Sequence, residues 1–321
     1  MQEAILEVKN LSVELGNKSA LAVENVSFSL YAGKTLALVG ESGCGKTMTA
    51  LSILQLQAKN FSCTGEILYR GNDLLKMKEK ALRKIRGSKI SMIFQDPMSA
   101  LNPVYTINDQ MMELVLLHLN IGIHEAQNLV FESLKEVGLK EEIAFQYPHT
   151  LSGGMKQRVM IAMSLMCKPD IVIADEPSTA LDVTVQSQVL ELIKDLQKKY
   201  KMALLLVTHD MGVVAEMADS VIVMYASRAV EKGPVKKIFY EMDHPYTKGL
   251  FLSRPHREKT AKRLPCIEGS VPSIHKRPEG CFFMPRCKEA QAICKKNPPG
   301  FRRDQHISHC WFSKLKETKM K

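Results

Sequence analysis

The sequence predicts an α/β protein whose parallel sheet carries a phosphate-binding loop. Short apolar runs at 35–39 and 171–175 predict buried strands, and each run ends where residues with phosphate or metal chemistry begin. A change in composition predicts a second part of the chain. Residues 253–321 hold 17 Lys and Arg against 6 Asp and Glu, and half of the 14 prolines, whereas residues 1–252 hold 27 against 28. We therefore expect a main domain over 1–252 and a small cysteine-containing C-terminal extension over 253–321.

The overall composition is that of an ordinary globular protein, with 45% hydrophobic and 24% charged residues in 321. No run of apolar residues approaches the roughly 18 that a membrane-spanning helix needs. The N-terminal residues carry acids and lack a signal-peptide pattern. We therefore expect any association with a membrane to depend on a partner.

The strand at 35–39 is followed by a glycine-rich loop and then by a helical stretch over 48–55. The loop reads Gly40-Glu41-Ser42-Gly43-Cys44-Gly45-Lys46-Thr47. This spacing is typical of loops whose backbone N–H groups surround a phosphate, because glycine permits the winding and the helix N-terminus adds a positive dipole. We expect Lys46 to reach the β- and γ-phosphates of a nucleotide and Thr47 to ligate Mg²⁺.

The second apolar strand, at 171–175, ends in Asp175, and Glu176 follows directly. The carboxyl end of a central parallel strand lies beside the phosphate loop in folds of this kind. We expect Asp175 to hold Mg²⁺ through water. Glu176 has no packing role in an apolar core, so we expect it to orient or deprotonate the attacking water.

Two further strands end in polar residues. The strand at 202–207 leads to His209, which we expect to bond the γ-phosphate and to hold Glu176 in place. The strand at 90–94 leads to Gln95, which can contact both Mg²⁺ and the attacking water. The sequence therefore predicts a hydrolytic site in which these three residues act together with the loop lysine.

A further motif, Leu151-Ser152-Gly153-Gly154-Met155, stands between the phosphate loop and Asp175. In this order the motifs resemble those of the ATP-binding subunit of ABC transporters, over roughly residues 5–237. The resemblance implies ATP and Mg²⁺ as cofactors and two nucleotide domains paired head to tail. Ser152, Gly153 and Gly154 of one domain would complete the γ-phosphate site of the other. Thr179-Ala180-Leu181-Asp182 would run along the dimer seam, with Asp182 among the nucleotide-binding residues.

The same resemblance implies a helical subdomain over about 98–147, where the apolar pattern predicts amphipathic helices. In that family the subdomain and the loop at Gln95 form a groove that receives a short helix from the membrane subunit. One position differs. The family places an aromatic residue on the adenine where this chain has Leu15, so the sequence leaves the choice between ATP and GTP open.

Four of the eight cysteines cluster in the extension, at Cys281, Cys287, Cys294 and Cys310. Without a signal peptide a disulfide framework is not expected, and four thiolates so close in sequence suggest a metal site. Zinc sites favour closer pairs, whereas wider gaps suit an iron–sulfur cluster. Spacing alone leaves three alternatives: an iron–sulfur cluster, zinc, or unligated thiols.

The extension resembles the C-terminal region of oligopeptide and dipeptide importer ATPases, a group that also includes nickel-chelate importers. The segments that carry this resemblance are His244-Pro245-Tyr246-Thr247, Ile267-Glu268-Gly269-Ser270-Val271-Pro272 and Gly280-Cys281-Phe282-Phe283-Met284-Pro285-Arg286-Cys287. Leu151 to Arg158 fits the same group, so Met155 is a mark of the subfamily. The resemblance implies a [4Fe–4S] cluster on the four cysteines.

We therefore expect an ATPase that energises import of oligopeptides or dipeptides from the cytoplasmic face of the cell (inner) membrane, where it is peripheral. The resemblance implies a second, homologous ABC ATPase subunit, two membrane permease subunits and an extracytoplasmic substrate-binding protein. An importer of nickel or another metal chelate is the alternative. The basic extension is the only feature that supports a soluble ABC ATPase acting on nucleic acid. This support is weak, so we expect no nucleic acid as a partner.

Overall fold

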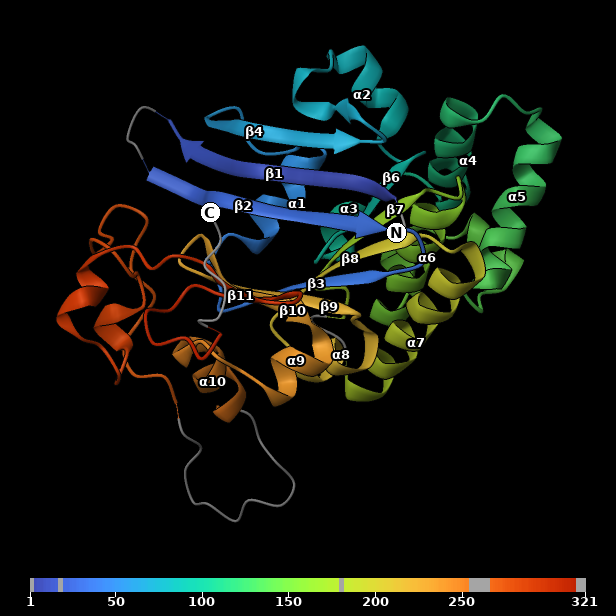
Figure 1. Ribbon diagram of the computed structural model, residues 1–321. Helices are drawn as coiled ribbons and strands as arrows, with labels where there is room; N and C mark the ends of the chain where they lie inside the picture. Colours follow the sequence, from blue (N-terminus) through green and yellow to red (C-terminus); the bar gives the residue numbers. More distant parts are fainter. Residues whose placement is uncertain (1–2, 17–19, 179–181, 254–265, 316–321) are drawn as a thin grey trace. The chain divides into compact units, whose positions relative to one another are not determined.

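The computed structural model describes residues 3–16, 20–178, 182–253 and 266–315 (Figure 1). The chain divides into two compact units, which are described separately. Unit 1 comprises Met1–Leu6, Leu30–Thr35 and Tyr69–Leu206. Unit 2 comprises Glu7–Ser29, Leu36–Leu68 and Val207–Lys321, so it includes the extension.

Unit 1 contains a parallel pair of buried strands, β6 (Ile90–Ile93) and β7 (Ile171–Asp175), with β8 (Ala203–Thr208) next to β7. In the register of the pair, Ile90 lies opposite Ile171 and Ile93 opposite Ala174. Every residue of these three strands is buried, which explains why they read as unbroken apolar runs. The strands predicted at 90–94, 171–175 and 202–207 are thereby confirmed to within one residue.

The remaining elements of unit 1 are mostly helical. They are β5 (Asn72–Asp73), η1 (Leu74–Lys76), α2 (Glu79–Ile85), α3 (Pro97–Ala100), α4 (Ile107–His118), α5 (Ile123–Glu136), η2 (Glu141–Phe145), η3 (Pro148–Thr150), α6 (Gly153–Leu165) and α7 (Val183–Tyr200). The helices of the described residues include none that is long and apolar enough to cross a membrane.

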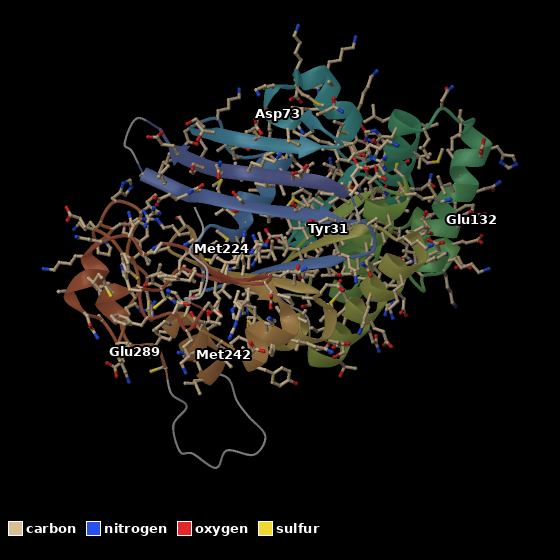
Figure 2. All side chains as sticks on the ribbon, in the orientation of Figure 1. Tyr31, Asp73, Glu132, Met224, Met242 and Glu289 are labelled. Atoms are coloured by element: carbon tan, nitrogen blue, oxygen red, sulfur yellow. The ribbon has the colours of Figure 1, made fainter. Side chains whose placement is uncertain are left out.

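Helices α4 and α5 lie side by side and are amphipathic, as the pattern over 98–147 predicts (Figure 1). Helix α4 begins at a capping box, in which Thr106 and Asp109 each bond the other's backbone N–H. Its buried positions recur about once per turn, for example at Met111 and Val115. On α5 the acidic side chain of Glu132 projects outward (Figure 2). Apolar burial on one side therefore holds this helical pair in place.

Unit 2 contains strands of two sheets. The first has the order β2 (Ala20–Tyr31), β1 (Ala4–Leu15) and β4 (Phe61–Tyr69). The second has the order β11 (Phe301–Arg303), β12 (His306–Ser308), β10 (Arg228–Pro234), β9 (Ser220–Tyr225) and β3 (Thr35–Val39). Strands β3 and β9 are parallel, whereas β10 is antiparallel to both of its neighbours.

The helices of unit 2 are α1 (Lys46–Ile53), α8 (Met211–Met217), α9 (Val235–Tyr240) and α10 (Pro245–Leu252). The extension adds the short helices η4 (Met284–Arg286) and η5 (Ala292–Lys295). Its Phe283 enters the core between Tyr225 and Tyr246, with ring centroids 5.2 Å and 5.4 Å from those of the two tyrosines. Burying such a ring stabilises the unit by about 2 kcal/mol, so the extension is part of this core.

A buried acid also fastens the extension to unit 2. Glu231 on β10 is fully buried and lies 2.7 Å from Nε2 of His306 on β12. The same carboxylate accepts the backbone N–H groups of Asp243 at 2.9 Å and His244 at 3.0 Å. Strand β12, the start of α10 and β10 therefore meet at one satisfied carboxylate.

We expect His244 to make the stability of the protein fall in acid. Burial lowers the pKa of its imidazole to about 4, with His309 and Lys248 acting in the same direction and Glu231 and Asp243 opposing. Because the folded-state pKa lies below the ordinary value of 6.5, stability is full above pH 6.5 and is lost as the pH falls toward 4. Between pH 7.5 and pH 5 the loss from this group should be about 2 kcal/mol.

The measurement is the urea concentration at the midpoint of unfolding, at pH 7.5 and at pH 5, for the wild type and for His244→Asn. The imidazole Nδ1 accepts the N–H of Tyr246 at the start of α10, a capping role that asparagine can take without titrating. The variant should show a smaller acid loss, while the exposed control His124→Asn should behave as the wild type. Equal acid losses in wild type and His244→Asn would contradict this assignment.

Candidate nucleotide site

Three residues of the phosphate loop in unit 2 have positive φ values, a backbone conformation that glycine adopts more readily than other residues. Gly40, Gly43 and Gly45 have φ values of 152°, 75° and 99°. A Cβ atom on Gly40 would lie 2.2 Å from the carbonyl oxygen of Met224, and one on Gly45 would lie 2.5 Å from that of Ala22. The glycines therefore allow the loop to wind closely against its neighbours.

The loop lysine is buried and bonded to the loop itself. Lys46 is 5% exposed, and its Nζ donates to the carbonyl oxygens of Gly40 at 2.9 Å and Glu41 at 3.2 Å. Ser42, Gly43 and Thr47 are exposed, and α1 begins at Lys46. The predicted strand–loop–helix arrangement is confirmed. An exposed turn of N–H donors, a hydroxyl and a nearby ammonium fits a phosphate chain with Mg²⁺.

Cys44 contributes to this loop through packing. Its side chain is fully buried, and its carbonyl oxygen accepts the N–H of Ser227 at 3.0 Å. Burial raises the pKa of the thiol above its ordinary value. Its backbone N–H also donates to the carbonyl oxygen of Glu41 at 3.3 Å, so both the side chain and the backbone of Cys44 support the loop.

Unit 1 brings Gln95 and Glu176 together at the ends of β6 and β7. The amide Nε2 of Gln95 donates to Oε2 of Glu176 at 3.1 Å. Asp175 is 2% exposed at the last position of β7. Glu176 has a φ of 46°, an uncommon backbone for a residue with a side chain and one that is often found at functional sites.

Helix α6 begins at the Ser-Gly-Gly motif. The Oγ of Ser152 accepts the N–H of Met155 at 3.3 Å, and Ser152 and Gly153 are exposed. First-turn N–H groups of a helix have no acceptor within the helix, so this end can serve an anion. A Cβ on Gly154 would lie 3.0 Å from a methyl group of Val185, which leaves little room for a larger residue.

Gln157 is a buried polar residue near the site that was not predicted from the sequence. Its Nε2 donates to the carbonyl oxygen of Pro177 at 2.7 Å in a buried position, which ties α6 to the segment after Glu176. Its place one turn after the Ser-Gly-Gly motif was the available signal, but a polar residue on a helix is ordinarily assigned to the surface.

Two predicted residues lie at helix starts. The Oδ1 of Asp182 accepts the N–H groups of Thr184 at 3.1 Å and Val185 at 3.0 Å, so it caps α7. Thr179, Ala180 and Leu181, which were predicted to line a dimer seam, lie outside the described residues. His209 is exposed just after β8, and the following Asp210 caps α8.

The predicted site residues are divided between the units. Unit 1 holds Gln95, Asp175, Glu176, Asp182 and the segment 152–154, and unit 2 holds the loop 40–47 and His209. Their catalytic roles stay predictions.

The prediction of an iron–sulfur cluster in the extension is wrong. In the part of the chain that the structure describes, no group of three or more His, Cys, Asp or Glu side chains is placed to hold a metal ion. Cys281, Cys287, Cys294 and Cys310 line one apolar cavity of about 20 Å³. That is close to the space that a single water molecule needs.

Burial changes the acidity of three of the four thiols. It raises the pKa of the Cys281 and Cys287 thiols above their ordinary value, and that of Cys310 to about 12. The finding that overturns the cluster is the absence of a metal-holding group among the described residues. The finding also goes against zinc, and all four are free cysteines in the structure.

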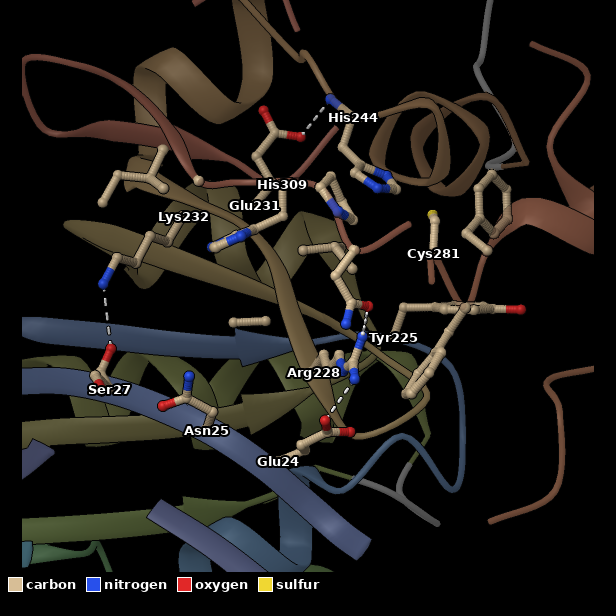
Figure 3. Close-up of a pocket in the computed structure, with 18 of the residues that line it drawn as sticks. Glu24, Asn25, Ser27, Tyr225, Arg228, Glu231, Lys232, His244, Cys281 and His309 are labelled. Carbon is tan, nitrogen blue, oxygen red and sulfur yellow. Dashed lines mark hydrogen bonds and ion pairs between the residues drawn. The ribbon is translucent and has the colours of Figure 1, made fainter. Parts of the chain in front are cut away.

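Unit 2 also contains a pocket of about 470 Å³ between its first sheet, β10 and the extension (Figure 3). Two of its charged residues, Glu24 and Arg228, form an ion pair of 2.5 Å. Lys232 donates to the carbonyl oxygen of Ser27 at 3.3 Å, and burial with the nearby Arg302 lowers the pKa of its ammonium. The pocket is therefore lined by aromatic and aliphatic side chains and by charged side chains that mostly have partners.

Two family models match the sequence. The model described as ABC transporter matches residues 23–179, and the model described as the C-terminal region of the oligopeptide/dipeptide transporter matches residues 230–294. The second match spans the end of the main domain and most of the cysteine-containing segment. The phosphate loop, Gln95, the segment 151–155 and Glu176 thus fall within the first matched region, and Cys281, Cys287 and Cys294 within the second.

Among the relatives, the chain is 47% identical to the dipeptide transport ATP-binding protein DppD of Bacillus subtilis (strain 168), over 96% of this chain and 95% of DppD. It is 48% identical to the oligopeptide transport ATP-binding protein AppD of the same organism, over 92% of each. Both are described as ATP-binding proteins of peptide transport, and neither name refers to an iron–sulfur protein.

Two solved structures resemble the chain. One is the dimeric ATP-binding cassette MJ0796 bound to ADP and Pi, with a TM-score of 0.64, 27% identity, and coverage of 72% of this chain and 98% of that one. The other is CbiO1 of Clostridium perfringens, part of an ABC transporter complex, with a TM-score of 0.65, 28% identity, and coverage of 75% and 92%.

Proposed function

Because this chain belongs to the ABC transporter ATPases, we propose that it hydrolyses ATP to drive the import of dipeptides or oligopeptides through a membrane permease. The observation that carries this proposal is the match to peptide-transport ATPases along nearly the whole chain, at 47% identity over 96% of it. The match includes the oligopeptide/dipeptide transporter region at residues 230–294. A chain that matched the ABC transporter model but lacked this region would support a proposal of ATP hydrolysis alone.

For hydrolysis, the loop at Gly40–Thr47 would bind the phosphates through its N–H groups and Lys46. Thr47, Asp175 and Gln95 would hold Mg²⁺, which when bound neutralises charge on the β- and γ-phosphates. Their oxygen donors suit this ion.

Glu176 would accept the proton of the attacking water, and the Gln95 amide, 3.1 Å from its carboxylate, orients that carboxylate. His209 would bond the γ-phosphate. These assignments are supported by the order of the motifs and by the exposure of His209 at the end of β8.

A second ATPase subunit would complete each site. Ser152 and Gly153 are exposed at the start of α6, so they are available to a nucleotide on another chain. MJ0796, which shares 27% identity with this chain, is a dimer in its solved structure. We infer a head-to-tail pair in which Ser152–Gly154 of each subunit contacts the γ-phosphate bound by the other.

An ATPase of this group works in a transporter complex with permease subunits. We propose that this complex contains a second, homologous ATPase, two permease subunits and an extracytoplasmic substrate-binding protein. The ATPase would then lie peripherally at the cytoplasmic face of the membrane. Two arginines of the basic extension, Arg277 and Arg286, are paired with acids of unit 2, Glu24 and Glu41, so their charges serve contacts within the protein.

The test is transport by the complete complex. The tagged full chain should co-purify with permease subunits from solubilised membranes. After reconstitution with the binding protein, a labelled dipeptide should enter the vesicles in an ATP-dependent way. Uptake of a nickel–histidine chelate but not of peptides would favour the alternative substrate. Failure of the chain to co-purify with any membrane protein would overturn the proposed role in transport.

A further inference from the structure

Arg286 of the extension contacts the phosphate loop through the side chain of Glu41. Its Nη1 lies 2.6 Å from Oε2 of Glu41, and its Nη2 lies 3.0 Å from Oε1. The two planar groups therefore form a bidentate ion pair between residues 245 positions apart. The Arg286 side chain is 6% exposed. The phosphate-loop spacing does not specify an acid at position 41, so the motif alone does not account for this pair.

The extension holds Arg286 in the orientation that this contact needs. Its Nε donates to the carbonyl oxygen of Glu268 at 2.9 Å, and its Nη2 also donates to that of Ile267 at 3.2 Å. The guanidinium carbon lies 5.7 Å from the ring centroid of Tyr225. The bond to Glu41 raises the pKa of Arg286 above its ordinary value, so the side chain stays charged. The arginine is therefore positioned before any ligand binds.

Glu41 is itself held at three points. Its side chain is bonded to Arg286, and its backbone N–H donates to the hydroxyl oxygen of Tyr246 at 3.0 Å. Its carbonyl oxygen accepts the Nζ of Lys46 at 3.2 Å. The residue that Arg286 contacts is thus also one of the two on which the loop lysine rests.

Charge gives this contact a consequence for nucleotide binding. Glu41 brings a carboxylate into a loop that binds a chain of phosphates, and like charges repel over such short distances. The guanidinium of Arg286 offsets that carboxylate. Loss of Arg286 would leave Glu41 negative, with 29% of its side chain exposed, beside the phosphate site.

We propose that Arg286 is a positioning residue of the nucleotide site, through which the extension neutralises and holds Glu41 and thereby strengthens ATP binding. This inference rests on the proposed binding of ATP by Gly40–Thr47. It makes the C-terminal extension a contributor to nucleotide affinity, in addition to any role in the transporter complex.

The experiment is calorimetric titration of the full chain with ATP in EDTA, where no hydrolysis occurs. Arg286→Gln should raise the Kd for ATP by about tenfold, which corresponds to about 1.4 kcal/mol. Arg286→Gln combined with Glu41→Gln should restore most of the affinity, because the unpaired carboxylate is gone. Arg286→Lys should be intermediate, since it keeps the charge without the bidentate contact. Lys288→Gln, which removes an exposed charge from the same extension, should bind as the wild type.

The outcomes separate this inference from the proposed function. If the wild type binds no ATP, the proposed function fails. If the wild type binds ATP and Arg286→Gln binds equally well, the inference alone fails. The inference also fails if Arg286→Gln combined with Glu41→Gln binds ATP as weakly as Arg286→Gln alone. That result would mean that Arg286 only supports the structure, because removing the Glu41 carboxylate would not restore the affinity. Should Arg286→Gln not fold, Glu41→Gln alone still tests the charge argument, since it should bind ATP at least as tightly as the wild type.

Discussion

Replacing Glu176 by glutamine is expected to slow ATP hydrolysis by about 100- to 10,000-fold while ATP binding is retained, the range typical of a lost general base. Glutamine has the same shape as glutamate and the same backbone preferences. It can still accept the hydrogen bond that Gln95 donates at 3.1 Å. The substitution therefore removes the basic carboxylate and leaves the surrounding geometry in place.

The measurement is steady-state ATPase activity together with size-exclusion chromatography in the presence of ATP and Mg²⁺. The variant should accumulate as a closed dimer, because ATP that is not hydrolysed keeps the Ser152–Gly154 segments engaged. Glu132→Gln, which neutralises an exposed acid on α5, is the matched control and should turn over ATP normally. Unchanged turnover in Glu176→Gln would remove this residue from the proposed mechanism.

Replacing Lys46 by alanine is expected to weaken ATP binding by about 100-fold, because a charge-assisted contact to the phosphates contributes about 3 kcal/mol. The ammonium is bonded to the carbonyl oxygens of Gly40 and Glu41, within the loop that we expect to bind the phosphates. Alanine leaves the helix α1 intact but removes this cation from the loop.

The Kd for ATP is measured as above, and thermal unfolding shows whether the fold is retained. Lys59→Ala, an exposed lysine of the same unit, is the control and should bind ATP as the wild type. Normal ATP affinity in a folded Lys46→Ala protein would contradict the assignment of the loop.

Much of the main domain could be predicted from the sequence. The strands at 35–39 and 171–175 are confirmed at both ends, and the loop between Gly40 and Thr47 has the expected conformation. Each of these features depends on a few adjacent residues, such as an apolar run followed by glycines. Gln95 and Glu176 were each predicted as site residues at strand ends. The structure adds the contact between them, because the neighbouring parallel strands β6 and β7 bring their carboxyl ends together.

The extension was predicted less well. Spacing and resemblance both favoured a cluster on four cysteines, but the described residues hold no metal site, and burial keeps the Cys310 thiol protonated with a pKa of about 12. Thiol chemistry depends on desolvation, which the spacing of cysteines does not report. Gln157 was missed for a similar reason, since its buried bond to Pro177 depends on how α6 packs.

The sequence by itself therefore determined the class of fold, the phosphate loop and the polar residues at the strand ends, because local backbone geometry and apolar patterning specify them. The tertiary structure alone decided the state of the cysteines and the pairing of Arg286 with Glu41 across 245 positions. Burial and ion pairing depend on which distant segments pack together. In this chain the packing of Phe283 and His306 into unit 2 brings the extension to the phosphate loop.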